Sequence, residues 1–205
     1  MTLVSTALGY VIGLPLGVTL AVTGKGGIRE NKVVYRILDV ISNVIRSIPF
    51  LILLILIIPL TRFLVGKSYG SSATIVPLVI AAAPFIARMV ESSLQEVDEG
   101  VIEAAKSMGA GTWTIIFRVL LVEARTSLIV GVTIALGTIL GYSAMAGVVG
   151  GGGLGDIAIR YGYYRYQTDI MVVTIVILVL IVPVLQALGM MLSNWQTNLS
   201  VITCP

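Results

Sequence analysis

The stretch IMVVTIVILVLIVPVLQALGMML, residues 170–192, contains no charged side chain. A helix that spans a membrane needs about 20 mostly apolar residues, and this stretch is long enough. Across the 205 residues of the chain, 57% are hydrophobic, only 11% are charged, and the mean hydropathy is +1.04. A soluble domain is nearer to one quarter charged. The sequence therefore predicts an integral membrane protein.

Four earlier apolar stretches predict four more membrane spans. The expected fold is thus an all-α membrane protein with five transmembrane helices in a single domain over residues 1–205. The five spans are expected at about residues 3–22, 44–64, 73–90, 126–149 and 170–192.

The basic residues are distributed unequally among the connections between these spans. Four lie in the second and fourth connections: Arg62, Lys67, Arg160 and Arg165. Nine lie in the first and third connections: Lys25, Arg29, Lys32, Arg36, Arg46, Arg88, Lys106, Arg118 and Arg125. Short loops rich in Lys and Arg stay in the cytoplasm. We therefore expect the N-terminus outside and the C-terminus in the cytoplasm.

The segment 31–46 differs from the uniformly apolar spans. Its apolar residues recur at helical spacing, while polar residues such as Lys32, Arg36 and Asp39 occupy the other face. This pattern is typical of an amphipathic helix in the cytoplasmic interface. An early start of the second span is equally compatible with it.

Several classes of chemistry lack the residues that they need. The chain has no His, which removes the commonest general base and the commonest metal ligand. It has no phosphate-binding loop of the GxxxxGKS or GxxxxGKT type, and its glycine-rich run at 150–155 lacks the strand and helix that dinucleotide binding requires. We expect that run to form a tight turn. We expect no catalytic residue, no metal and no cofactor in this chain.

The aromatic and basic residues at 161–166 could suggest nucleic-acid binding. Their position beside the fifth span favours an aromatic belt at the membrane surface, so no nucleic-acid partner is expected. The expected spans contain no Asp or Glu, which argues against a carrier driven by protons.

Residues 94–109 carry the most informative pattern among the connections. Apolar residues from Leu94 to Met108 follow spacings of three and four, with charged residues opposite. A short amphipathic helix of this kind can bind in a partner's groove or lie on the membrane. Gly109 suits the position just after such a helix, and Thr112 suits the start of the next one.

This segment resembles the EAA loop of ABC importer permeases. The matching residues are Glu103, Ala104, Ala105, Gly109, Val119 and Leu121, while Val122 replaces the last proline of the family pattern. The resemblance implies that a cytoplasmic loop at about 94–118 docks on an ATPase subunit. The implied coupling helix contains Glu103, Ala104, Ala105, Met108 and Gly109.

Three other stretches resemble the methionine-importer branch of these permeases: residues 46–50, 83–91 and 141–147. The resemblance implies the fold of a type I ABC importer permease in the inner membrane of a bacterium. The implied partners are a second copy of the chain, two ABC ATPase subunits that hydrolyse ATP, an extracytoplasmic substrate-binding protein and the lipid bilayer. The implied function is non-catalytic import of methionine, with the D form left open beside the L form.

Tyr142, Ser143 and Met145 lie near the expected outer end of the fourth span. A flexible thioether can close a narrow pore by packing against its symmetry mate. We therefore expect these residues at the translocation path, with Met145 at a gate. A lipid-facing Met145 is the alternative, because a span has faces toward both lipid and bundle.

Two other classes of protein remain open at the level of the sequence. One is a gradient-driven carrier or channel for small solutes, which inverted internal repeats would favour. The other is an intramembrane enzyme, which would need a catalytic pair within the spans. Co-purification of a cytoplasmic ATPase distinguishes an ABC permease from both.

Overall fold

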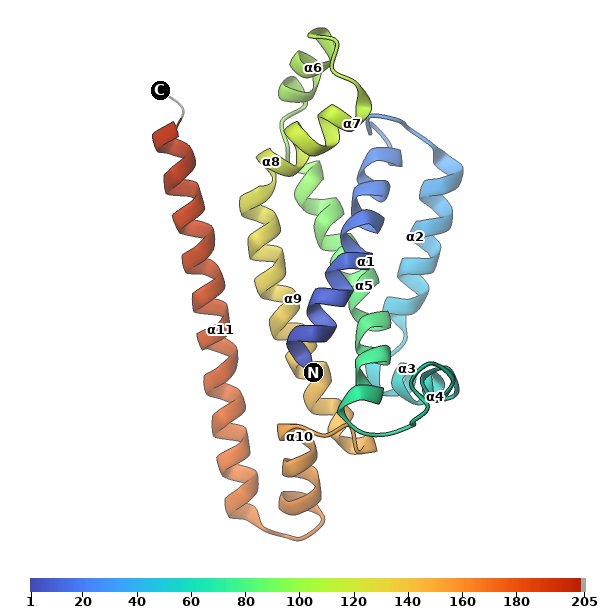
Figure 1. Ribbon diagram of the computed structural model, residues 1–205, viewed down its shortest axis with the longest axis vertical. Helices are drawn as coiled ribbons and strands as arrows, with labels where there is room; N and C mark the ends of the chain where they lie inside the picture. Colours follow the sequence, from blue (N-terminus) through green and yellow to red (C-terminus); the bar gives the residue numbers. More distant parts are fainter. Residues whose placement is uncertain (204–205) are drawn as a thin grey trace.

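The computed structural model describes residues 1–203, with side chains described through Met191 and at Ser193. Within this part, four helices are long and apolar enough to cross a membrane: α1 (Thr2–Thr23), α5 (Ser71–Gln95), α9 (Arg125–Met145) and α11 (Thr168–Thr203). They run along the long axis of the molecule (Figure 1). The fold is all-α in the described residues.

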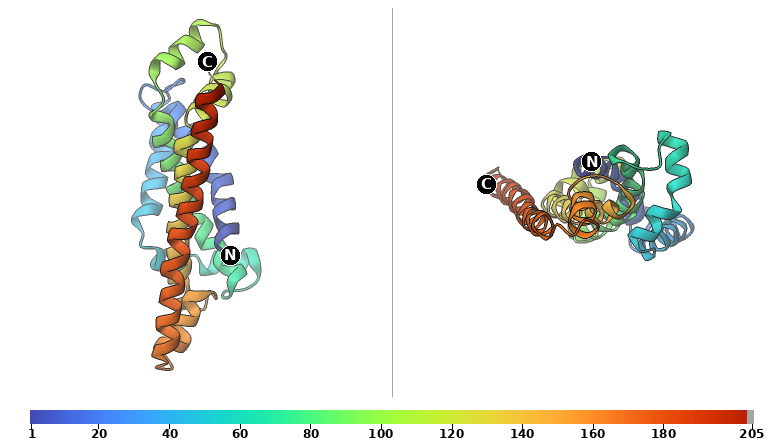
Figure 2. Two further views of the ribbon diagram at one scale, coloured as in Figure 1. Left: turned by 90° about the vertical axis from the view of Figure 1, so that its left-hand side faces the viewer. Right: turned by 90° about the horizontal axis from the view of Figure 1, so that it is seen from below.

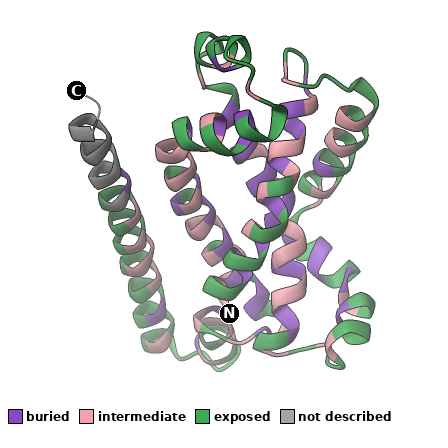
Figure 3. Cartoon of the chain, turned by 45° about the horizontal axis from the view of Figure 1, so that its top comes forward, coloured by how far each residue is buried: buried purple, intermediate pink, exposed green. Residues whose placement is uncertain are grey.

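The helix α5 lies at the centre of the bundle and contacts α1, α2, α3, α4 and α9. Its side chains Leu78, Ile86 and Val90 are completely buried, and the buried residues in Figure 3 concentrate along this helix and its neighbours. By contrast, α11 stands to one side of the bundle and contacts mainly α9 and the segment η3 (Ala158–Tyr163) (Figure 2).

The contact between α1 and α5 is unusually close because α1 presents glycines to its partner. A Cβ atom at Gly13 would lie 2.8 Å from the carbonyl oxygen of Ala83, and one at Gly17 would lie 2.5 Å from that of Ala87. Small residues spaced by four let two membrane helices approach closely enough for backbone packing. One face of α5 is therefore covered by α1.

The second expected span, 44–64, is not one helix. Its first part belongs to α2 (Lys32–Ser47), and the chain then bends by 102° into α3 (Phe50–Leu56), followed by α4 (Ile58–Val65). Pro49 sits at the bend, and a proline disfavours the helical conformation of the residue before it. If α2 and α3 together count as one broken span, the described residues contain five spans.

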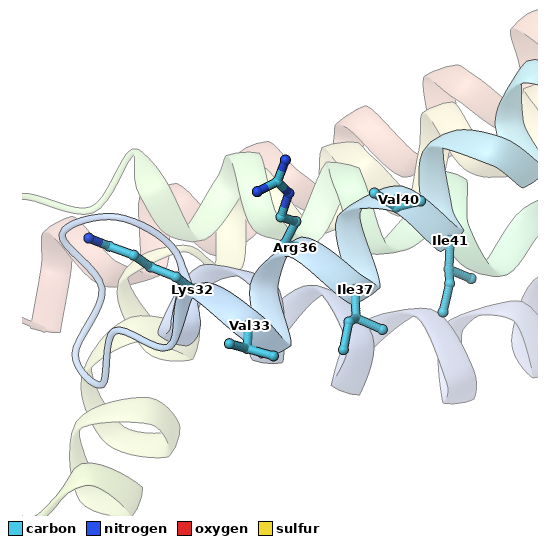
Figure 4. A pocket seen from close by; sticks show the side chains of 6 residues that line it. All are labelled: Lys32, Val33, Arg36, Ile37, Val40 and Ile41. Atoms are coloured by element: carbon cyan, nitrogen blue, oxygen red, sulfur yellow. The ribbon is translucent and has the colours of Figure 1, made fainter.

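The segment 31–46 forms α2, which stands upright beside α1 and α5 (Figure 1). Its N-terminus is capped by Asn31, whose side chain accepts hydrogen bonds of 3.2 Å from the amides of Val33 and Val34. Val33, Ile37 and Ile41 are exposed on one side of the helix, whereas Arg36 projects from the other (Figure 4). The helix α2 thus lies along α1 and α5 rather than across the end of the bundle.

The shorter segments gather at the two ends of the bundle (Figure 1). One end carries α6 (Glu99–Ser107), α7 (Thr112–Thr114), the π-helical segment η1 (Ile115–Leu120) and α8 (Leu121–Glu123). The opposite end carries α3, α4, the 3-10 turn η2 (Ala146–Val149), α10 (Leu154–Ile157) and η3. The glycine-rich run makes the expected turn there, with positive φ at Gly150, Gly152 and Gly153.

The glycine contact predicts a graded effect of added methyl groups. We expect Gly17→Ala to lower the thermal midpoint of the detergent-solubilised protein, because the new Cβ meets backbone, and overpacking of this kind typically costs about 1–3 kcal/mol. Gly9→Ala is the matched control, because its Cβ would lie 3.1 Å from the flexible end of Ile86 and from the Ala82 side chain. Equal midpoints for the two variants would contradict the proposed packing.

Candidate coupling loop and translocation path

The helix α6 is fixed at both of its ends by local hydrogen bonds. At the start, the Asp98 carboxylate accepts a 2.7 Å hydrogen bond from the amide of Gly100. At the other end, the amide of Gly109 donates to the carbonyl of Lys106 at 2.9 Å, and that of Ala110 donates to Ala105 at 3.0 Å. Gly109 has a φ of +79°, so it occupies the left-handed conformation that glycine adopts at helix ends.

The apolar pattern at 94–109 is divided between two helices. Leu94 belongs to α5, which ends at Gln95, and α6 begins at Glu99. The expected single helix is interrupted because Asp98 caps a new helix start. Thr112 also differs from expectation: it is the first residue of α7, Gly111 holds the capping position, and no side chain caps that helix.

The residues expected to form the coupling helix face different sides of α6. Glu103, Ala104, Met108 and Gly109 are exposed, with Met108 at 81% exposure. Ala105 is only 5% exposed, because α6 packs against η1. The small size of Ala105 therefore serves contacts within the chain, and the exposed face remains available to a partner.

Sequence reasoning missed an apolar surface beside this helix. Trp113 is 74% exposed and stacks on Phe117, with ring centroids 5.9 Å apart. Trp113 belongs to α7 and Phe117 to η1, the segments that follow α6 at the same end of the bundle (Figure 1). Their spacing of four residues on consecutive helical turns was the available signal.

A chain of charged side chains joins α2 to α5. The Arg88 guanidinium donates to Asp39, to Asn43 at 3.1 Å and to Glu91 at 2.7 Å. Glu91 is only 4% exposed, and it also accepts a 3.4 Å hydrogen bond from Gln95. Buried charges need such partners, because an unpaired one is costly.

Glu91 corrects one expectation about the spans. The third span was expected to end at residue 90, but α5 continues to Gln95, so a buried carboxylate does lie within this membrane helix. Its ion pair with Arg88 compensates its charge. The expected lack of carboxylates in the spans, which was directed against a proton-driven carrier, therefore no longer holds. Because Glu91 is paired with Arg88, its role is structural.

The three residues expected at the path point in different directions from the end of α9. The ring of Tyr142 stacks on Phe50 of α3, with centroids 4.6 Å apart and planes inclined by 6°. Ser143 is buried, and Met145 is 52% exposed. Of the three, Met145 is thus the most available to another chain or to lipid.

The chain shares this architecture with several known proteins. Residues 13–196 match the model of a family described as binding-protein-dependent transport system inner membrane component. A probable D-methionine transport system permease protein from Vibrio cholerae is 51% identical over 189 residues, which are 92% of this chain and 84% of the relative. A methionine import system permease protein from Bacillus subtilis is 47% identical over 175 residues, or 85% and 79% of the two chains.

Two solved structures are similar as well. A chain of an inward-facing methionine ABC transporter aligns with a TM-score of 0.93 at 50% identity, covering 95% of this chain and 90% of that one. A chain of an amino acid ABC transporter aligns with the same coverage, a TM-score of 0.74 and 22% identity, and supports the fold alone.

The ion network predicts that α2 depends on Asp39 for its position. We expect Asp39→Asn to destabilise the protein by about 1–3 kcal/mol, because it removes a charged hydrogen-bond partner of a mostly buried guanidinium. The measurement is the thermal midpoint in detergent. Glu30→Gln is the control, because the Glu30–Lys32 pair is exposed and such pairs contribute about 0–1 kcal/mol. A larger loss from the control would overturn the assigned role.

Proposed function

The chain belongs to the family of binding-protein-dependent transport system inner membrane components, and we propose that it imports methionine as the permease subunit of an ATP-driven ABC transporter. The assignment of methionine as the substrate rests on the similarity to permeases named for methionine and D-methionine. Their sequences are 47–51% identical to this one over most of both chains. The similarity to a methionine transporter structure over 95% of the chain supports the same assignment. Import of both enantiomers is consistent with these names.

Energy for the transport comes from a separate subunit. The chain has no phosphate-binding loop for ATP, so it is a non-catalytic component and a partner ATPase hydrolyses the nucleotide. Two such ATPases, a second copy of this chain and an extracytoplasmic substrate-binding protein complete the transporter.

In this proposal, the ATPase subunit binds the exposed face of α6. Glu103, Ala104, Met108 and Gly109 lie on that face, and Trp113 extends it. A short helix with fixed ends can move as a rigid lever when a partner's groove holds it. Because α6 follows directly on α5, movement of the lever is passed to the central helix of the bundle.

The orientation of the chain follows from its charges. The end that carries α6 and the loop after α1 is cytoplasmic in this proposal, because most of the nine basic residues of the first and third connections lie at that end. The start of α1 lies toward the other end of the molecule (Figure 1), so this proposal has the N-terminus outside. In a dimer, Met145 at the outer end of α9 closes the path against its symmetry mate.

The coupling proposal is tested by enlarging the exposed small residue of the lever. Ala104→Trp should lower ATPase association roughly tenfold or more, because overpacking of a close contact costs about 1–3 kcal/mol. Ala7→Trp, at an exposed position on α1, is the control for the added ring. The measurements are membrane abundance, ATPase co-purification and ATP-driven methionine uptake in vesicles. Normal uptake by Ala104→Trp at normal abundance would exclude this face as the docking site.

Gly109 offers an independent test of the same lever. Gly109→Ala forces a side chain into a left-handed conformation at a cost of about 1–3 kcal/mol, and should reduce uptake at unchanged ATPase abundance. Gly111→Ala is closely matched, because both positions have open space for a Cβ and only Gly109 has positive φ. If Gly109→Ala and Gly111→Ala import methionine at the same rate, the left-handed turn at the end of α6 is not needed for coupling.

The gate proposal makes a separate prediction. Met145→Ala should raise ATP hydrolysis in the absence of substrate, or let methionine leak along its gradient, because the closing side chain is removed. Met190→Ala, at an exposed position on α11, is the control. If basal hydrolysis and leak both stay at the parental level, Met145 faces lipid.

A further inference from the structure

The first turns of α2 separate two hollows of different character. The basic cavity, about 370 Å³ in volume, lies between α2 and the loop after α1 and is lined mainly by charged and polar side chains. The apolar groove, about 490 Å³, follows the exposed face of α2 (Figure 4). Lys32 and Arg36 line both hollows and so form the border between them. We propose that the two hollows together bind a phospholipid with an anionic headgroup, whose phosphate lies in the basic cavity and one of whose acyl chains lies in the apolar groove.

The basic cavity carries an excess of positive charge. Its cations are Lys25, Lys32 and Arg36, and its carboxylates are Glu30 and Asp39. Asp39 is already bound by Arg88 of α5. Glu30 lies 3.8 Å from Lys32, but both side chains are exposed, and exposed ion pairs are weak. Three cations therefore face only one carboxylate that is not held elsewhere, which favours an anionic ligand.

Two of these cations have no partner within the chain. In the part of the chain that the structure describes, no ion pair or hydrogen bond engages the side chains of Lys25 and Arg36. A guanidinium can bind two oxygens of one phosphate through parallel hydrogen bonds, and an ammonium adds a compact charge. Together they offer the donors that a phosphate diester can accept.

The loop that completes the basic cavity is held against the end of α1. The amide of Gly27 donates to the carbonyl of Gly24 at 3.0 Å, which closes a turn around Lys25, and the amide of Arg29 donates to Val22 at 3.1 Å. A Cβ at Gly27 would lie 2.4 Å from the Val22 carbonyl oxygen, so the close return of the chain depends on glycine. The backbone that carries Lys25 is therefore fixed before any ligand binds.

The apolar groove continues from the basic cavity along α2. Its apolar side chains are 51–68% exposed, and they are those of Val33, Ile37, Val40 and Ile41. Figure 4 shows Lys32 at one end of the groove and Ile41 toward the other. Between these two residues the helix rises by about 13.5 Å, which is close to half of the roughly 30 Å hydrocarbon core of a bilayer. The groove thus matches an acyl chain of one leaflet in length.

The order of the two hollows matches the order of polarity in a lipid. Lys32 begins α2 at the end of the bundle that carries α6, and α2 runs from there beside α1 and α5 (Figure 1). The basic cavity therefore lies nearer the membrane surface than the apolar groove does. Basic pockets at this depth bind anionic headgroups, and each Lys or Arg adds to the attraction. In the proposed orientation the lipid belongs to the cytoplasmic leaflet.

Other occupants of this face fit the charges less well. A zwitterionic phospholipid brings no net charge to balance the three cations. If the groove met the same groove of a second copy, Lys32 and Arg36 would approach like charges, which repel. An anionic phospholipid supplies both the negative charge for the basic cavity and the chain for the apolar groove.

The experiment maps where a labelled lipid attaches to the chain. The complete transporter is placed in phosphatidylcholine vesicles that contain a small fraction of phosphatidylglycerol with a photoactivatable acyl chain. After illumination, peptides of this chain are analysed by mass spectrometry. Adducts should concentrate on residues 33–41, and they should be about fivefold fewer or less when phosphatidylcholine carries the same photoactivatable chain.

Neutral substitutions of the bordering cations test the recognition of charge. Lys32→Gln and Arg36→Gln should each lower the adducts of phosphatidylglycerol at residues 33–41 about fivefold, and should leave those of phosphatidylcholine unchanged. Arg29→Gln is the matched control, because Arg29 is exposed in the same loop but lines neither hollow. It should leave the adducts of both lipids unchanged.

The possible contrary results identify other occupants. Equal labelling by both lipids, or labelling by phosphatidylglycerol that survives Lys32→Gln and Arg36→Gln, would overturn the recognition of an anionic lipid. Loss of this labelling on addition of inorganic phosphate would assign the basic cavity to a free anion. Absence of adducts at residues 33–41 would also overturn the site, and a disulfide between two copies that carry Ile37→Cys and Cys204→Ser would then identify a second copy as the occupant. None of these readouts uses methionine, so the test is separate from that of the proposed function.

Discussion

The close contact between α1 and α5 determines which faces of the central helix remain for the other helices. Because Gly13 and Gly17 bring α1 against the backbone of α5, one face of the central helix is permanently covered. The other faces of α5 are then divided between α9, α2, α3 and α4. A bundle in lipid gains little from hydrophobic burial between helices, so tight packing and polar contacts must supply its stability. The glycines supply the first, and the Arg88 network supplies the second.

These two kinds of contact lie in different parts of α5. The face of α5 that packs on the α1 glycines carries buried apolar residues: Ala82, Ala83, Ile86, Ala87 and Val90. The end of α5 carries Arg88, Glu91 and Glu96, of which the first two are paired and the third accepts a hydrogen bond from Ser127 of α9. Since α6 follows within a few residues, a force on the lever acts first on the segment of α5 that holds these charges.

The sequence predicted the features that depend on local composition. Apolar length located α1, α5, α9 and α11, and the EAA spacing located the turn at Gly109, whose positive φ depends on glycine. Features set by distant partners were not predictable. The Asp39–Arg88 pair joins α2 to α5 across 49 residues of chain, and the burial of Ala105 depends on the path of η1. Val122 replaces the family's proline, yet the chain still turns at Ala124 before α9 begins.

The ion pair between Asp39 and Arg88 has a consequence for the synthesis of the protein. When α2 leaves the ribosome, α5 has not yet been made, and Asp39 and the neighbouring basic residues have no partner in the bilayer. Charged side chains at the centre of an isolated helix strongly oppose its insertion, so α2 is expected to rest at the membrane surface at that stage. Once α5 has been made, Arg88 can pair with Asp39, and Glu91 arrives with it as a second partner of the guanidinium. The amphipathic pattern of α2 suits both stages: a helix at the membrane surface before α5 is made, and a helix packed against α1 and α5 in the folded chain.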